Sequence, residues 1–339
     1  MNKKLTGKLA SVFIASSCLF SGIAFAHSSE SEKEQPQIMT KVQAGFYHFQ
    51  LGDAKITALS DGSIGLDKSL LTNVHEHKVD KLLKNAYVES STVDTSVNAY
   101  IISLKDKVIL VDTGTGGLFG ANLNKLSISL KNAGYTPEQV TDIVVTHFHG
   151  DHIGGLITDG KFTYPNATLH LNKKEVDYWL NQDLYAKAPE QGKKFFKDAI
   201  DVITPYIKSD KVKQFTGEDA KPVKLFDGML AIQSHGHTAG HTFYEIESKG
   251  KKLVFWGDIV HIPQVQFVDP TVTIKFDSDA KQAEIQRQKA FADAASKGYL
   301  VAVSHMPFPG VGHLAKDSGK GYQWIPIPYV NNALATLGK

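Results

Sequence analysis

Apolar runs of strand length, alternating or continuous, dominate the chain from Gly45 onward. We expect strands in FYHFQLG and AKITALSDG, with the Asp61–Gly62 pair forming a turn after the second. A hairpin with its tip at residues 105–107 is predicted by SVNAYIISLKDKVILVDTG. Further buried strands are predicted by DIVVTHFH, ATLHLN, KLVFWGDIVH and GYLVAVSHMPFPG.

Apolar residues at helical spacing separate these strands. The stretch 117–135 shows this spacing and predicts a helix that stops at Gly134. Residues 173–207, rich in lysine and aromatic side chains, predict two helices over the core. The helix through KQAEIQRQKAFADAAS is expected to be capped by Ser278 or Asp279. Strands followed by helices recur in both halves, which predicts an α/β sandwich of sheets covered by helices.

The first 26 residues have the layout of a secretory signal peptide. Three lysines precede the apolar run LASVFIASSCLFSG, and the segment closes on the small-residue pattern Ala24-Phe25-Ala26. We expect cleavage after Ala26 and a periplasmic or secreted protein without a stable membrane anchor. An uncleaved membrane anchor and a lipoprotein cut at Cys18 are the alternatives.

Cleavage changes what the composition implies. Residues 27–44 are interpreted as a flexible N-terminal segment and residues 45–339 as a single domain. The 37 basic residues exceed the 35 acidic ones by only two, and three lysines leave with the leader. The mature chain keeps a single arginine, Arg287, which argues against a nucleic-acid partner. Its only cysteine, Cys18, also leaves, so a metal site must be built from His, Asp and Glu.

The segment VVTHFHGDHIGG (residues 144–155) concentrates metal-binding side chains. His147 and His149 can point one way after the strand, which leaves Asp151 and His152 to face a second position nearby. Imidazole nitrogen and carboxylate oxygen are ligands of zinc and similar divalent ions. A pH-sensing or adventitious histidine cluster is the alternative.

Three later segments add histidines and an aspartate. SHGHTAGH supplies His235, His237 and His241, FWGDIVH supplies Asp258, and VAVSHMPFPG supplies His305. Asp258 and His305 each come at the end of a predicted strand. Strand ends are where an open sheet offers active groups to a site.

The chain resembles the metallo-β-lactamase superfamily of dinuclear metallohydrolases in HFHGDH, GHTAGH, WGD and the final SH. Over residues 45–329 it resembles the methyl parathion hydrolase group in GFYHFQLGDAKITALSDG, TSVNAYIIS, VDTGTGGLFG, SHGHTAGH, FDSD and GKGY. The resemblance implies an αββα sandwich of two mixed β-sheets flanked by helices, the metallo-β-lactamase fold. It also implies a metal-dependent hydrolase, and a homodimer as a family expectation.

The resemblance assigns a role to each ligand. The seven implied metal ligands form two sets that share Asp258 as a bridge. The first set is His147, His149 and His237, and the second is Asp151, His152 and His305. Support from behind these ligands is expected of His235, His241 and Asp112. For Asp112 the alternative is a turn-forming aspartate.

Two divalent cations, with zinc the expected ion, would activate a bridging hydroxide for attack on a carbonyl or phosphoryl centre. Iron, manganese or cobalt would fit the same ligands. Asp151 and Asp258 are the predicted catalytic residues, with Asp151 relaying a proton to the leaving group. No serine or cysteine nucleophile is needed for this chemistry.

The predicted substrate pocket rests on the same resemblance. Phe119, Trp179 and Phe196 match aromatic positions that surround the leaving group in the methyl parathion hydrolase group. For Trp179 the alternative is packing within a helix core.

The chain also departs from that group. His261 stands where the group has an aliphatic residue, and Ile274 and Phe276 stand where it has threonine and leucine. These changes predict a narrower pocket with an imidazole beside the metals, which favours a flat or slender ester such as a lactone. A polar neighbour without a catalytic part is the alternative for His261.

The leading hypothesis is an exported dinuclear zinc hydrolase that opens lactones or aryl esters, with acyl-homoserine lactones among the candidates. Its partner would be a small-molecule ester or lactone. The first alternative is an organophosphate triesterase, and the non-enzymatic alternative is a periplasmic metal-binding protein. A β-lactamase, a diiron redox protein and a nuclease fit the ligand pattern and arginine content less well.

Overall fold

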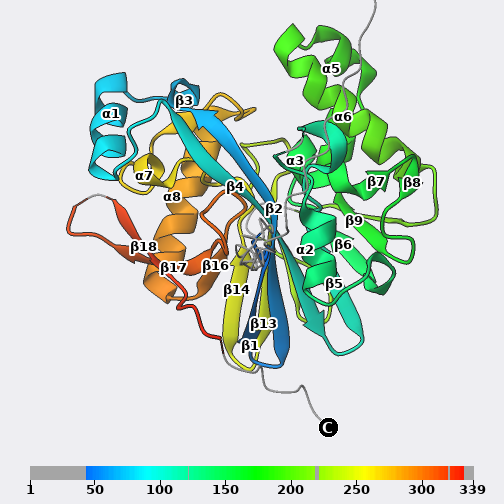
Figure 1. Cartoon of the computed structure of the whole chain (residues 1–339). Coiled ribbons are helices and arrows are strands. Elements are labelled where there is room, and N and C mark those ends of the chain that lie inside the picture. Colours follow the sequence, from blue (N-terminus) through cyan, green and yellow to red (C-terminus); the bar gives the residue numbers. More distant parts are fainter. Residues whose placement is uncertain (1–42, 121, 218–220, 320, 332–339) are drawn as a thin grey trace, which may run out of the picture. The chain divides into compact units, whose positions relative to one another are not determined.

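The computed structural model describes residues 43–120, 122–217, 221–319 and 321–331 (Figure 1). The predicted signal peptide and nearly all of the predicted flexible segment lie outside the described residues, and both remain predictions. Among the helices of the described residues, none is both long enough and apolar enough to cross a bilayer.

Seven strands form the first sheet: β1 (Phe46–Leu51), β2 (Ala54–Asp67), β4 (Thr92–Leu104), β5 (Lys107–Val111), β6 (Asp142–Val144), β9 (Thr168–Asn172) and β10 (Val212–Phe215). They lie in the order β1-β2-β4-β5-β6-β9-β10. The pairs from β1 to β5 are antiparallel and those from β5 to β10 are parallel, so the sheet is mixed. Valine and isoleucine dominate β5 and β6, as expected of parallel strands that are buried on both faces.

Seven further strands form the second sheet: β11 (Val223–Phe226), β12 (Met229–Gln233), β13 (Thr242–Ser248), β14 (Lys251–Phe255), β16 (Leu300–Ala302), β17 (Val311–Lys316) and β18 (Tyr322–Pro326). Neighbours in the sheet follow this sequence order, and only β14 and β16 pair parallel. Two small ribbons complete the strands: β3 (Leu71–Thr72) with β15 (Thr273–Ile274), and β7 (Ile157–Thr158) with β8 (Lys161–Phe162).

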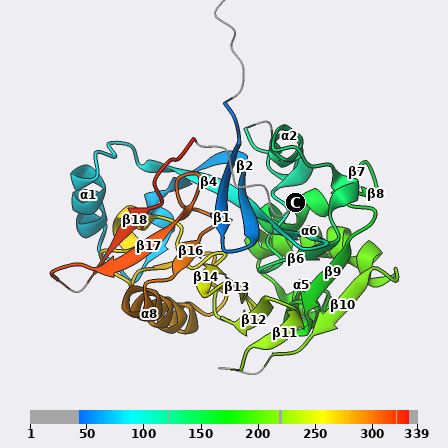
Figure 2. The same cartoon turned by 90° about the horizontal axis from the view of Figure 1, so that it is seen from below.

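Eight α-helices accompany the two sheets in the described residues. They are α1 (Glu76–Asn85), α2 (Leu126–Asn132), α3 (Gly150–Ile153), α4 (Lys173–Trp179), α5 (Gln182–Lys187), α6 (Glu190–Ile207), α7 (Pro263–Gln266) and α8 (Ala280–Lys297). In Figure 2, α2 and α6 lie on one side of the paired sheets and α8 lies on the other. The predicted αββα sandwich of two mixed sheets is therefore confirmed.

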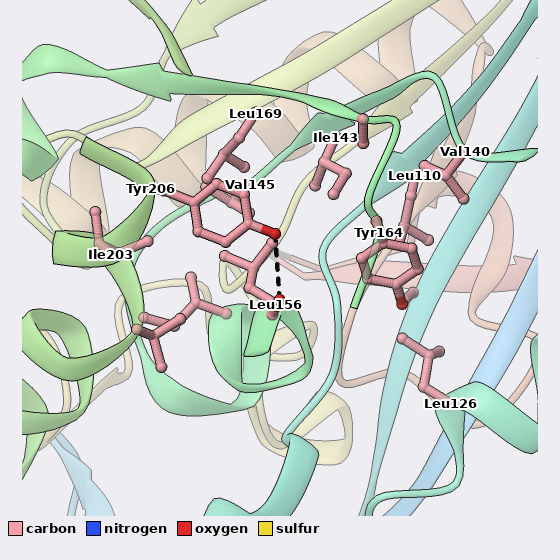
Figure 3. Packing of buried hydrophobic residues seen from close by; sticks show 14 of the residues in the cluster. Leu110, Leu126, Val140, Ile143, Val145, Leu156, Tyr164, Leu169, Ile203 and Tyr206 are labelled. Carbon is pink, nitrogen blue, oxygen red and sulfur yellow. Dashed lines mark hydrogen bonds between the residues drawn. The ribbon is translucent and has the colours of Figure 1, made fainter. Parts of the chain in front are cut away.

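Three apolar clusters hold the layers together. One joins the first sheet to α2 and α6, a second lies between the two sheets, and a third joins the second sheet to α8. Figure 3 shows the first of these, in which Leu110, Ile143 and Leu169 of the sheet pack with Leu126 of α2 and Ile203 of α6. Full burial of such a side chain contributes about 1.5–3 kcal/mol. This cluster holds α2 and α6 against the first sheet, and it includes Phe148, which lies between His147 and His149.

The predicted turn at Asp61–Gly62 is wrong. Strand β2 continues to Asp67, with a bulge between Ser60 and Gly62 where Gly62 has a φ of 123°. The buried Asp61 carboxylate accepts hydrogen bonds from the backbone nitrogens of Thr115 (2.9 Å) and Leu126 (2.8 Å). The Asp-Gly pair therefore turns a carboxylate inward, where it holds the segment that leads into α2.

Helices occur in the segments where they were predicted, but their lengths and their number differ from the prediction. Within 117–135 the α-helix is only α2, and Gly134 follows it with a φ of 87°. The stretch 173–207 holds three helices, because Asn181 interrupts it and caps α5 through its Oδ1. Asp279, one of the two predicted residues, caps α8 by accepting a hydrogen bond from the Gln282 nitrogen (3.0 Å).

Candidate metal centre

The histidine motif lies in the loop after β6. That strand ends at Val144, and the chain passes through His147 and His149 into α3, which carries Asp151 and His152. His147 and His152 are 0% and 1% exposed. The motif is thus buried between the layers, and its polar atoms need partners there.

The other predicted ligands follow strands of the second sheet, His237 after β12, Asp258 after β14 and His305 after β16. The structure brings all seven predicted ligands together in two groups, each with ligand atoms within 4.8 Å of one another. The first group is His147, His149, His237 and Asp258, and the second is Asp151, His152, Asp258 and His305. Asp258 belongs to both groups.

The Asp258 carboxylate lies at the centre. Its Oδ2 is 3.1 Å from His305 Nε2 and 3.4 Å from His237 Nε2. The same oxygen is 3.7 Å from His147 Nε2, while Oδ1 is 3.1 Å from His152 Nε2. One carboxylate therefore faces imidazoles of both groups.

Three buried atoms at this centre have no hydrogen-bond partner among the described residues: His147 Nε2, His152 Nε2 and Asp258 Oδ1. A buried polar atom left unpaired costs about 1–3 kcal/mol. Cations that accept lone pairs from these atoms, one in each ligand group, would remove this cost, and nitrogen with carboxylate oxygen is a donor set for zinc and similar ions. The residues present fit two divalent cations.

Protonation of the imidazoles is set by burial and by nearby carboxylates. Burial, reinforced by neighbouring imidazoles, lowers the pKa of His147 and His149 well below the ordinary histidine value. At His237 the effect of burial is outweighed by Asp258 and Asp277, which raise its pKa to about 9. Because ligation needs a neutral imidazole, protons and cations compete for His237 Nε2.

Carboxylates orient one histidine in each group. His237 Nδ1 donates to Asp277 Oδ1 (2.9 Å), which leaves His237 Nε2 facing Asp258. His152 Nδ1 donates to Asp112 Oδ2 (2.9 Å), and Asp112 has a left-handed φ of 58°, an uncommon conformation for aspartate. Such contacts fix the tautomer and ring orientation of a ligating histidine. Asp112 therefore lies where the predicted supporting residue should be.

Two further histidines are fixed by the backbone. His305 Nδ1 donates to the Ser96 carbonyl (2.9 Å). His241 Nδ1 donates to the Ser234 carbonyl (3.1 Å), and its Nε2 accepts from the Asp258 nitrogen (3.1 Å). Burial lowers the pKa of His241 to about 3, in keeping with a neutral ring that accepts at Nε2. His241 thus supports the backbone of Asp258.

A cavity of about 130 Å³ opens beside the two groups. Its polar wall consists of His149, Asp151, Asp258, His261 and His305. Its apolar wall consists of Ile64, Leu66, Val97, Phe119, Leu123, Phe195 and Phe276. The cavity is small and mostly apolar, so it suits a slender hydrophobic group placed against the ligands.

His261 lies in this wall and contacts both groups. Its Nε2 donates to Asp258 Oδ2 (3.1 Å), and its ring stacks on that of His305 at 5.1 Å between centroids. Burial lowers its pKa to about 4. The predicted imidazole beside the ligands is therefore present, and it is neutral at physiological pH.

Comparison with known proteins identifies the family. The profile of the Metallo-beta-lactamase superfamily matches residues 92–305, a span that includes every ligand of both groups. The chain belongs to the metallo-β-lactamase superfamily. It is a metal-dependent hydrolase of that superfamily.

Three relatives illustrate the similarity. The solved hydrolase AbOPH of the β-lactamase superfamily is 38% identical, with a TM-score of 0.80, and the alignment covers 86% of this chain and 100% of that one. AidC, described as a dizinc quorum-quenching lactonase, is 28% identical with a TM-score of 0.77 over 85% of this chain and 99% of its own. The N-acyl homoserine lactonase of Bacillus thuringiensis is 24% identical over 226 residues, 61% of this chain and 80% of that protein.

Some residues predicted to line the pocket of this superfamily member lie outside the cavity wall. Trp179 and Phe196 are buried in the helix–sheet core, 4.8 Å apart between ring centroids, and neither lines the cavity. Phe195, which the sequence analysis did not select, lines it instead. Ile274 is buried in β15 outside the cavity wall. The supporting role expected of His235 stays a prediction.

The sequence analysis also missed two supporting carboxylates. Asp277 lies in FDSD, a motif noted for its resemblance, so a signal for it was present. Glu175, on α4, accepts hydrogen bonds from backbone beside both histidine loops. Nothing in the local sequence KKEVDYW distinguishes Glu175 from a surface glutamate.

The one arginine, Arg287, supports the site from behind. It is 0% exposed, and its Nε donates to the Ile259 carbonyl (2.7 Å), next to Asp258. Its Nη1 donates to the Val272 carbonyl (2.5 Å), and its Nη2 lies 3.9 Å from Asp277 Oδ2. Arg287 thus ties α8 to the segments that carry Asp258 and Asp277.

Proposed function

We propose that the protein is an exported dinuclear zinc hydrolase that opens lactones or aryl esters, with N-acyl homoserine lactones among its substrates. The observation that carries the proposal is Asp258, which belongs to two ligand groups and borders an apolar cavity. Two ligand groups sharing one carboxylate suit a pair of cations, and the cavity offers room for the substrate directly beside them.

Bound cations would supply an activated water at neutral pH and would stabilise negative charge that develops on the substrate oxygen. The chain provides the rest of the chemistry. Asp151 lies in the cavity wall with its side chain 20% exposed, so its Oδ2 can take the proton that the attacking water releases and pass it to the departing oxygen. The neutral His261 ring donates to Asp258 and so holds the shared carboxylate in place.

The cavity supports a slender ester. Phe119, Phe195 and Phe276 offer flat surfaces to an acyl chain or an aromatic ring. A lactone presents one ring to the ligands, whereas a phosphotriester must fit three substituents around its phosphorus atom. AidC and the Bacillus thuringiensis relative are both described as lactonases, which supports the same choice of substrate.

A panel of lactones and esters, run with metal analysis on the protein lacking residues 1–26, tests this proposal. We expect about two zinc ions per chain, turnover of dihydrocoumarin and of acyl-homoserine lactones, and loss of turnover on chelation. A metal-replete protein that is inert on every lactone and ester would overturn the proposal.

An organophosphate triesterase is the second candidate. The aromatic wall at Phe119 and Phe276 favours it, because that wall also suits an aryl leaving group. Rates on dihydrocoumarin and methyl paraoxon separate the two candidates under one set of conditions. We expect the lactone to be the better substrate, and a large preference for the phosphotriester would reverse this ranking.

Export is tested by cell fractionation. We expect the mature protein in the periplasm or the medium, with His27 as its first residue. A full-length chain that stays in the cytoplasm would contradict the export part of the proposal and leave the chemistry untouched.

A further inference from the structure

Glu175 is a buried carboxylate that the proposed chemistry does not use. It lies on α4 and is 1% exposed. The ion pairs found in the described part of the chain include none with Glu175. A buried charge without a counter-charge costs several kcal/mol unless hydrogen bonds stabilise it.

Three hydrogen-bond donors face this carboxylate. Oε2 accepts from the Phe148 backbone nitrogen (3.0 Å) and from the Trp179 indole nitrogen (2.8 Å). Oε1 accepts from the Gly240 backbone nitrogen (2.5 Å). All three partners only donate, so both oxygens accept; these hydrogen bonds favour the ionised carboxylate, while burial raises the pKa of Glu175 above its usual value.

The two backbone donors belong to different ligand loops. Phe148 stands between His147 and His149 in the loop after β6 of the first sheet. Gly240 follows His237 by three residues in the loop after β12 of the second sheet. One side chain therefore spans the two loops whose histidines form the first ligand group.

The bridge acts at the point where these loops meet. His237 Nε2 and His149 Nδ1 are 3.1 Å apart. Trp179, which donates to Glu175, also lies edge-on against the His149 ring, with centroids 5.5 Å apart. The hydrogen bonds of Glu175 to the two loops and the Trp179 indole together limit the positions that the His149 ring can take.

The approach of α4 to the second loop is close. A Cβ at Gly240 would lie 2.8 Å from the Glu175 nitrogen, so this position requires glycine. Asn172, at the start of α4, also donates from its side chain to the Gly240 carbonyl (2.8 Å). Gly240 is thus held from both its nitrogen and its oxygen by the same short segment.

We infer that Glu175 is a positioning residue that sets the spacing of His149 and His237, and so the affinity of the first ligand group for its cation. The inference rests on the proposed two-cation function. The direct effect of Glu175 is on the first group, because its hydrogen bonds among the described residues reach Phe148, between His147 and His149, and Gly240, beyond His237, and none reaches α3 or the loop that carries His305.

The test is a titration of metal-free Glu175→Gln with Co²⁺, followed by visible absorption and calorimetry. His237→Ala and His305→Ala serve as references that assign each binding step to its group. We expect the first-group step to weaken about 10–100-fold, the range for loss of a residue behind a metal ligand. The second-group step should stay within about threefold of the unmodified protein, because an untouched supporting shell costs no affinity.

Glu190→Gln is the matched control, since Glu190 is an exposed glutamate on α6 that pairs with Lys193 at 2.8 Å. Circular dichroism and thermal unfolding of the metal-free variants check the fold. If Glu175→Gln does not fold, Glu175→Asp decides the matter. This variant keeps the negative charge on a side chain that is shorter by one methylene. It should also weaken cation binding in the first group alone, but by a smaller factor than Glu175→Gln.

Equal weakening of both steps, or binding indistinguishable from Glu190→Gln, would overturn the inference. These readouts need no substrate. A failed lactonase proposal would appear as two normal binding steps without turnover in the unmodified protein, whereas a failed Glu175 inference appears in the binding steps themselves.

Discussion

The two ligand groups share Asp258 but differ in how the chain surrounds them. The first group consists otherwise of buried histidines, and it is backed by the carboxylates of Asp277 and Glu175. In the second group Asp151 has a side chain that is 20% exposed at the cavity. Both groups therefore reach the cavity wall, the first through His149 and the second through Asp151 and His305, and the most exposed of these ligands, Asp151, belongs to the second group.

The supports differ in kind as well. In the first group His237 is oriented by the Asp277 carboxylate, whereas in the second group His152 is oriented by the Asp112 carboxylate and His305 by the Ser96 carbonyl, a neutral acceptor. Negative charge behind a histidine makes it a more basic ligand than a carbonyl does. Two cations in one site need not therefore be held with equal strength. The variants below measure the binding of each cation separately.

The largest effect is expected from Asp258→Asn, which removes the charge common to both groups. Activity should fall roughly 10³-fold or more, because an activated water at neutral pH depends on the cations. Metal analysis of the purified variant, run beside the unmodified protein, checks the cause. Retention of both cations with activity within tenfold would show that the two groups do not depend on Asp258.

The variants His237→Ala and His305→Ala are each expected to lose one of the two cations. Their loss of activity should be smaller than that of Asp258→Asn. Each should keep about one cation per chain and lose activity by about 10²-fold or more, at least as much as loss of a supporting residue costs. Metal content and Co²⁺ spectra of the two variants should differ from each other. Identical spectra would mean that the chain has a single cation site, which would contradict the description of two ligand groups.

Replacement of the supporting carboxylates sharpens the contrast further. Asp277→Asn should weaken cation binding in the first group and Asp112→Asn in the second, each by about 10–100-fold. Competition with a chelator measures both affinities in each variant. The comparison fails if either substitution weakens both groups alike.

Phe276→Ala should leave both groups intact and change only the cavity wall. Loss of the ring from an apolar pocket is expected to raise KM for an aryl ester about tenfold, with two cations still bound. Steady-state kinetics and metal analysis on the same preparation check this outcome. A fall in metal content would show that Phe276 supports the ligands rather than the substrate.

The smallest effect on the site is expected from Asp142→Asn, which alters an aspartate–histidine pair remote from the ligands. Asp142 Oδ1 lies 2.9 Å from His170 Nε2 and Oδ2 lies 2.6 Å from Lys107 Nζ. Burial alone would raise the pKa of Asp142, but these hydrogen bonds outweigh it and the pKa is lowered.

Because the folded-state pKa of Asp142 is lowered, its stabilisation is complete above the unfolded value of about 4 and is lost as the pH falls further. At pH 7 the variant should therefore lose about 1–3 kcal/mol of unfolding free energy. The difference should shrink below about pH 4. Urea unfolding of metal-free protein at several pH values measures it, and cation binding at pH 7 should not change. A constant difference across that range would contradict the assignment.

Local signals account for what the sequence predicted well. The hairpin around residues 105–107 and the Asp279 cap depend on neighbours within a few positions, and both are found. The residues of HFHGDH also lie close together in any fold that ends a strand before them. Their meeting with His237, Asp258 and His305 was implied by family resemblance, since spacing alone does not determine it.

Contacts between distant segments account for what was missed. Glu175 and Gly240 are 65 residues apart, and Asp277 and His237 are 40 apart. On α6 the sequence analysis selected Phe196 where the structure turns Phe195 to the cavity. One residue rotates a helix position by about 100°, so the facing side chain depends on how the helix docks.

Arg287 provides a natural probe of local opening in the folded protein. It is the one guanidinium of the chain, it is fully enclosed, and it is bonded to the backbone beside Asp258. A reagent selective for guanidinium groups should therefore find no target while α8 is docked, and a single target once it lifts. The rate of labelling would measure how often the wall behind Asp258 opens, without any introduced probe.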